Sequence, residues 1–173
     1  MIWLVQAVGV LGIVSHVASF QQSRRSRVLL LLMLGCVFWT VHFGLLGFYT
    51  AAAANLVAAV RSYVFYAYKR RENNWVLYGF IAAIAAVAVL TWQGPMSLLP
   101  FVASLFSTYG GWSASAQRIR WLTLPAPLFW LAHNVLARSV GVVSDVVVLM
   151  SIVVGLYRHR GTLERTDTVQ KSS

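Results

Sequence analysis

The stretch RSRVLLLLMLGCVFWTVH, Arg25 to His42, begins with arginines, continues as a long apolar run and ends on a histidine. The run extends further, so that the 33 residues from Val28 to Val60 carry no formal charge. One helix of that length would be about 50 Å long at about 1.5 Å per residue, whereas the hydrocarbon core of a bilayer is about 30 Å thick. We therefore expect two membrane helices here, joined by a hairpin near Gly47 to Thr50.

A second stretch, AQRIRWLTLPAPLFWLAH from Ala116 to His133, has the same plan. Residues 20–42 align with residues 111–133 without a gap, at a constant offset of 91 positions. The identical pairs include Arg27 and Arg118, Phe38 and Phe129, Trp39 and Trp130, and His42 and His133. The alignment predicts an internal repeat.

The composition places the chain in a membrane. Apolar residues make up 59% of it and charged residues 10%, with a mean hydropathy of +0.71, which leaves too little polar surface for a soluble globule. A net charge of +10 could suggest nucleic acid, but the basic residues form short clusters between apolar runs. Such clusters are typical topology signals, so we expect no nucleic-acid partner.

Seven apolar segments are long enough to be membrane spans. They are Ile2 to Phe20, Val28 to Phe48, Thr50 to Tyr68, Trp75 to Trp92, Met96 to Ala116, Trp121 to Ala137 and Val140 to Tyr157. With the N-terminus outside, twelve of the fourteen Lys and Arg residues fall on the cytoplasmic side. The two exceptions are Arg61, inside the third span, and Arg138, in an outer turn.

The repeat and the span count predict an all-α membrane protein with two parallel three-helix repeats joined by a linker helix, because two triplets of the same sense need an odd connecting helix. The first repeat is residues 1–68, the linker helix with its loops is residues 69–95, and the second repeat is residues 96–160. We expect residues 161–173 to be a disordered cytoplasmic tail.

The chain resembles the YgjV-like family of bacterial inner membrane proteins, which is distantly similar to the PQ-loop and SWEET transporters. The resemblance covers about residues 1–160, and the residues that carry it are SFQQSRRSR (Ser19 to Arg27), HFGLLGFY (His42 to Tyr49), Arg61, His133, Asn134, Ser139, Gly141 and Asp145. It implies a seven-helix fold in the inner membrane, with the N-terminus in the periplasm and the C-terminus in the cytoplasm.

The chain departs from the SWEET-like pattern in two ways. Gln21 and Gln22 stand where PQ-loop proteins carry proline and glutamine, and all four prolines lie at or after the start of the fifth span. The first triplet therefore lacks the proline hinges that SWEET-like transporters use. Asn55 and Asp145 fall near the positions where those transporters carry sugar-binding asparagines, and the acid at position 145 argues against a neutral sugar.

Polar side chains gather at one depth in the predicted spans. His42, Asn55, His133 and Asp145 each lie about five residues from the outer end of their span, roughly 7 to 8 Å inside the boundary at about 1.5 Å per residue. Aromatic faces beside hydrogen-bonding groups suit a sugar-sized polar solute. We predict that the solute is bound by a histidine layer, which consists of Trp39, His42, Asn55, Trp130, His133, Asn134 and Asp145.

We expect the two imidazoles of the histidine layer to face each other across a hydrated seam between the halves. The histidines and Asp145 can change charge near physiological pH when perturbed, which keeps proton coupling open. The alternative is that these polar groups only join helices, through pairs such as His42 with Asn55 or His133 with Asp145.

Arg61, His16 and Cys36 also lie inside the predicted spans. The simpler interpretation of Arg61 is that its stem snorkels to the cytoplasmic interface, and the alternative is a gate or anion contact. His16 is expected to be structural or interfacial, and Cys36 a small hydrophobic residue.

The chain shows no metal-ligand spacing, phosphate loop or nucleophile elbow, so we predict neither an enzyme nor a cofactor or metal. The function predicted is a transporter or facilitator of a small polar solute, such as a sugar or an organic acid. The alternative is a non-transporting membrane module that binds a partner or lipid. A second copy of the chain is a further partner that the sequence allows.

Overall fold

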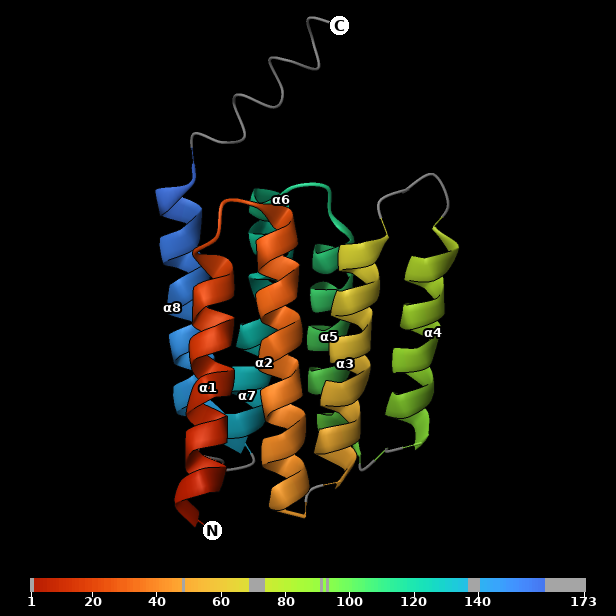
Figure 1. Ribbon diagram of the computed structural model, residues 1–173. Coiled ribbons are helices and arrows are strands. Elements are labelled where there is room, and N and C mark those ends of the chain that lie inside the picture. Colours follow the sequence, from red (N-terminus) through yellow and green to blue (C-terminus); the bar gives the residue numbers. More distant parts are fainter. Residues whose placement is uncertain are drawn as a thin grey trace, which may run out of the picture.

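The computed structural model describes residues 2–47, 49–68, 74–90, 92, 94–136 and 141–160, which form eight α-helices and one short 3-10 helix (Figure 1). The helices are α1 Ile2–Phe20, α2 Arg25–Leu45, α3 Tyr49–Ala67, α4 Trp75–Leu90, the 3-10 helix η1 Pro95–Ser97, α5 Leu98–Trp112, α6 Ala116–Thr123, α7 Pro125–Leu136 and α8 Gly141–Arg158. The described part of the chain contains no strand, so the all-α prediction is confirmed at this level.

The helices α6 and α7 form one interrupted rod. Leu124 between them has helical angles, φ −51° and ψ −39°, but Pro125 and Pro127 cannot donate the backbone hydrogen bonds that would continue the helix. This rod begins at Ala116, five residues before the predicted span, because the side chain of Ser115 accepts a bond from the backbone N–H of Arg118 at 3.2 Å. The described helices therefore make seven rods.

Six of the seven rods close a ring. In order around it, α1 contacts α2, α2 contacts α3, α3 contacts α5, α5 contacts the α6–α7 rod, α7 contacts α8, and α8 returns to α1. The helix α4 lies at the edge of the bundle beside this ring (Figure 1), where it packs on α5. A contact between α2 and α6 crosses the ring.

The polarity of this bundle is inverted relative to a soluble protein. Arg120 and Thr108 are fully buried, whereas the exposed fractions of Trp3, Trp75 and Leu90 are 87%, 74% and 84%. Water would drive these large apolar side chains inward, but a lipid environment leaves them outside and forces polar groups to find partners within the bundle. The helices are therefore embedded in a membrane.

Three helices are long and apolar enough to cross a membrane by themselves, over residues Trp3–Phe20, Arg25–Leu45 and Gly141–Arg158. Two shorter apolar helices are Ala51–Ala67 and Trp75–Leu90. The predicted split of the long apolar run is confirmed, since α2 ends at Leu45 and Gly47 has a φ of +80°, which glycine adopts without strain. Arg138 and the tail 161–173 lie outside the described residues.

Candidate functional site

The first half of the histidine layer packs on α1. Nδ1 of His42 lies 2.8 Å from the carbonyl oxygen of Val5, so this nitrogen is the donor. Gly9 and Gly12 leave room for the rings of His42 and Trp39, because a Cβ at Gly9 would lie 2.9 Å from Nδ1 of His42 and a Cβ at Gly12 would lie 3.1 Å from Nε1 of Trp39. This corrects the expected position of His42, whose ring is held against α1 of its own half.

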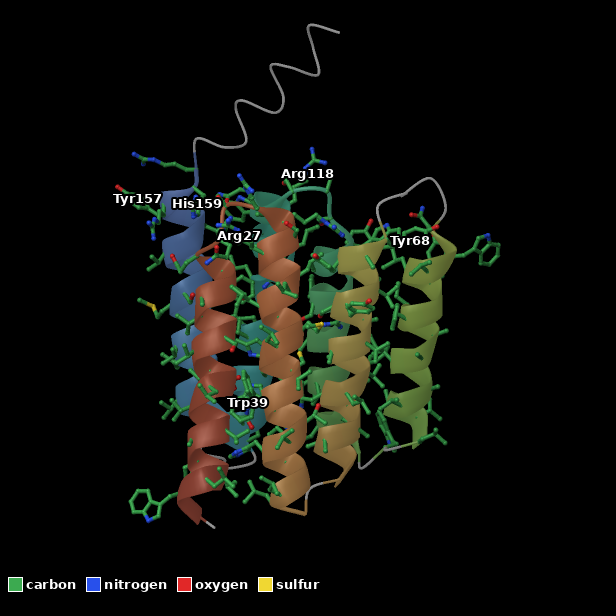
Figure 2. All side chains as sticks on the ribbon, viewed as in Figure 1. Arg27, Trp39, Tyr68, Arg118, Tyr157 and His159 are labelled. Atoms are coloured by element: carbon green, nitrogen blue, oxygen red, sulfur yellow. The ribbon has the colours of Figure 1, made fainter. Side chains whose placement is uncertain are left out.

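In each half, a tryptophan and a histidine of the histidine layer share one helical face. The ring centroids of Trp39 and His42 are 5.2 Å apart with an interplanar angle of 90°, and those of Trp130 and His133 are 6.0 Å apart at 88°. The i, i+3 spacing on a helix brings each pair together. Trp39 lies away from the end of the bundle that carries Arg27 (Figure 2).

The second half of the histidine layer contains a direct amide–acid bond. Nδ2 of Asn134 donates to Oδ2 of Asp145 at 2.7 Å, and this bond joins α7 to α8. Nδ1 of His133 is buried and has no hydrogen-bond partner among the described residues. Asn55 donates to the carbonyl of Ala51 on its own helix at 2.9 Å. The suggested pair of His42 with Asn55 is therefore wrong.

A second polar group, here called the interior cluster, consists of His16, Cys36, Arg61 and Thr108 from α1, α2, α3 and α5. Nη1 of Arg61 donates to Oγ1 of Thr108 at 2.7 Å, and Thr108 in turn donates to the carbonyl of Ser104 at 2.7 Å. Sγ of Cys36 is 3.8 Å from Nε2 of His16, and both groups lie within electrostatic range of Arg61. Since Thr108 is fully buried, Arg61 points inward, and the snorkelling interpretation is wrong.

Arg120 bonds to the end of α1 and is also fully buried. Its Nε donates to the carbonyl of Phe20 at 2.7 Å, its Nη1 donates to Oε1 of Gln117 at 2.9 Å, and its Nη2 donates to the carbonyl of Gln22. Nε2 of Gln117 donates to the carbonyl of Leu156 on α8 at 3.0 Å. We call this arrangement the Arg120 clasp.

Arg25 makes a matching set of bonds, the Arg25 clasp, in the other half. Its Nε donates to the carbonyl of Ser113 at 2.8 Å, and its Nη2 donates to the carbonyl of Phe65 at 2.7 Å and, at a long 3.5 Å, to that of Gly111. Both clasps therefore satisfy carbonyls at helix ends, which lack partners within their own helices. Arg27, Arg118 and His159 lie at the same end of the bundle (Figure 2).

The acceptors of the two clasps correspond to each other at the offset found in the sequence. Gly111, Ser113 and Leu156 lie 91 positions after Phe20, Gln22 and Phe65. The helix bounds follow the same offset, since α2 spans 25–45 and the α6–α7 rod spans 116–136. The donors differ between the clasps. Arg25 alone donates to its set of carbonyls, whereas Arg120 and Gln117 share the donation to the equivalent carbonyls of the other clasp.

Sequence reasoning missed Thr108 and treated Arg25 and Arg120 only as topology signals. The signal for Thr108 was weak, because a threonine in an apolar helix is common and only its proximity to Arg61 distinguishes it. The clasp arginines bond mainly to backbone carbonyls, which every residue carries, so no pairing pattern is visible in the sequence.

Comparison with known proteins agrees with a membrane-embedded chain. The family model Imp-YgjV, described as bacterial inner membrane protein, matches residues 3–162. The chain belongs to this family. Over 139 residues it is 27% identical to the inner membrane protein YgjV of Escherichia coli (strain K12), a match that covers 80% of this chain and 74% of that protein. No solved structure matches the chain.

Proposed function

We propose that this member of the YgjV family is a transporter or facilitator of a small polar solute, built from two three-helix repeats around a central path. The first repeat is α1 to α3, the second is α5 to α8, and α4 is the linker. The equivalent carbonyls of the two clasps support this repeat, as do the equivalent helix bounds. In such a repeat α1 corresponds to α5 and α3 corresponds to α8, so a contact of α1 with α8 corresponds to a contact of α5 with α3. Both contacts are present, which supports the repeat too.

The observation that carries the transport proposal is the inward direction of Arg61. An arginine inside an apolar helix costs about 2.5 to 3.5 kcal/mol on translocon scales, and such residues generally face a bundle interior or a water-filled path. Packing alone does not require a guanidinium here, because its described bond goes to a threonine hydroxyl that already donates to Ser104. Nδ1 of His133, which is buried and has no partner among the described residues, is a second polar group that supports the proposal.

The clasps supply a gate in this proposal. With the N-terminus in the periplasm, the end that carries Arg27, Arg118 and His159 faces the cytoplasm (Figure 2), in agreement with the positive-inside tendency. Each clasp joins one triplet to the other there, Arg25 through Ser113 and Arg120 through Phe20. An opening toward the cytoplasm would have to break these bonds, so the clasped state is closed on that side.

The test is solute uptake into sealed vesicles that contain the purified protein. We expect His133→Ala and Asp145→Asn to reduce uptake while the variants remain folded by size-exclusion chromatography. If the folded variants take up the solute as the parent does, the histidine layer does not line the solute path.

The second candidate function is a membrane module that binds a partner or lipid and does not transport. Three bonds of the histidine layer favour it, because His42, Asn55 and Asn134 all bond directly within the protein. This candidate predicts that a substitution that breaks one of these bonds, such as Asp145→Ala, lowers thermal stability in detergent while the parent binds no solute.

A further inference from the structure

We propose that Arg61 binds the carboxylate of a small monovalent organic acid beside Thr108, at the contact between α3 and α5. This inference rests on the proposed function and narrows its solute class from polar molecules in general to anions. The alternative solute class is neutral, such as a sugar or a polyol, and the experiment below separates the two.

The first argument is hydrogen-bond accounting at Arg61. A guanidinium has five N–H donors, and among the described residues one of them has an acceptor, the hydroxyl of Thr108 at 2.7 Å. Donors left without acceptors inside a membrane protein are costly, so a ligand with several acceptor oxygens stabilises this arrangement. A carboxylate matches the planar fork of arginine with two parallel bonds.

The second argument is charge. Asp145 is the acid that the structure describes, and its Oδ2 accepts from Asn134; Glu72, Glu164 and Asp167 lie outside the described residues. The other side chains of the interior cluster are a thiol, an imidazole and a hydroxyl. One permanent positive charge balances one carboxylate, whereas a phosphate dianion would need a second cation.

The third argument is that the Arg61–Thr108 contact lies deeper in the bundle than the bonds of the Arg25 clasp. The carbonyl of Phe65, which accepts from Arg25, is one helical turn past Arg61, and the carbonyl of Ser113 is five residues past Thr108. Arg25 therefore joins α3 to α5 about 6 Å nearer the end of the bundle than the Arg61–Thr108 contact, at about 1.5 Å per residue. An anion bound at Arg61 would lie deeper in the bundle than the bonds by which Arg25 joins α3 to α5, as an occluded solute requires.

The experiment compares acids with neutral molecules of similar shape on the purified full chain in neutral detergent, at constant ionic strength. The probes are lactate with lactamide, gluconate with sorbitol, and glucuronate with glucose, and binding is measured from the dependence of thermal unfolding on ligand concentration. The variants are Arg61→Gln, Arg61→Lys and, as the matched control for loss of one charge, Arg118→Gln on the exposed side of α6.

We expect at least one acid to stabilise the parent and its neutral partner not to. Arg61→Gln should weaken that acid by at least about tenfold, and Arg118→Gln should leave its dissociation constant within about twofold. Arg61→Lys keeps the charge but loses the fork, so it should bind with intermediate affinity and serves as the test if the glutamine variant does not fold.

Three results would overturn the inference in distinguishable ways. Binding of an acid that persists in Arg61→Gln would place the anion elsewhere. Stabilisation by the neutral probes alone would remove the anion class and leave the proposed transport function standing. If no probe binds the parent, both the anion site and the transport proposal fail, and the non-transporting module is favoured.

Discussion

Replacing Arg120 with methionine should strongly destabilise the protein, because the Arg120 clasp joins the two triplets. The guanidinium is fully buried and donates to the carbonyls of Phe20 and Gln22 and to the side chain of Gln117. Methionine keeps an unbranched apolar stem about as far as the position of Nε but supplies no donor. The substitution therefore removes every hydrogen bond that Arg120 donates while it keeps the packing of the stem.

The size of the effect follows from the acceptors left behind. A buried acceptor without a donor costs about 1 to 3 kcal/mol. The side chain of Gln117 can turn, and Gln22 follows α1 and is only half-buried, so the loss lies between about 1 and 6 kcal/mol. Relief from burying a charge offsets part of it, and we take about 3 kcal/mol as the net value. In a chain of this length that corresponds to a fall of about 6 to 12 °C in the midpoint of unfolding.

The assay is thermal unfolding of the purified protein in detergent, followed by tryptophan fluorescence. The control is Arg118→Met, an exposed arginine on the same short helix, which should unfold within about 2 °C of the parent. If Arg120→Met also unfolds within that range, the clasp does not hold the triplets together, and its proposed role as a gate loses its basis.

Further substitutions at four positions have defined outcomes. Gly155→Ala should lower the unfolding temperature in the same assay, because its Cβ would clash with the backbone oxygen of Phe20. Gly79→Ala meets open space and should leave the unfolding temperature unchanged or raise it. His42→Phe keeps a ring but loses the 2.8 Å bond to α1, so urea unfolding should show a loss of about 1 to 3 kcal/mol. Asp145→Asn can still accept from Asn134 and should unfold near the parent temperature, while Asp145→Ala should unfold earlier; equal values for both variants would show that the bond contributes nothing.

The helices were predictable because their apolar runs are limited by bilayer thickness and separated by charge. The predicted first span, Ile2 to Phe20, coincides with α1, and the long apolar run divides where expected. The rod formed by α6 and α7 was less predictable, since its amphipathic first turns, with Arg118 and Arg120, read as a loop. Ser115 starts the helix there by capping it, and Arg120 is buried because a helix end needs its donors.

The direction of each polar side chain was harder to predict than its depth. Helices such as α2 are apolar on all sides, so no hydrophobic face shows which neighbour His42 meets. The ring turns to α1 because Gly9 leaves a space for it and Val5 offers a carbonyl. Arg61 was expected at the interface for a similar reason, and the hydroxyl of Thr108 provides the inward acceptor that the sequence did not reveal.

Uptake of radiolabelled lactate, gluconate and glucuronate into vesicles most directly tests the central claim, that this chain transports an organic acid bound at Arg61. The vesicles contain the parent, Arg61→Gln or Arg118→Gln, each reconstituted at equal protein content. We predict saturable uptake of at least one acid by the parent and by Arg118→Gln, and uptake no greater than that of empty vesicles for Arg61→Gln. Equal uptake by the parent and Arg61→Gln, or no uptake above empty vesicles by any of the three, would contradict it.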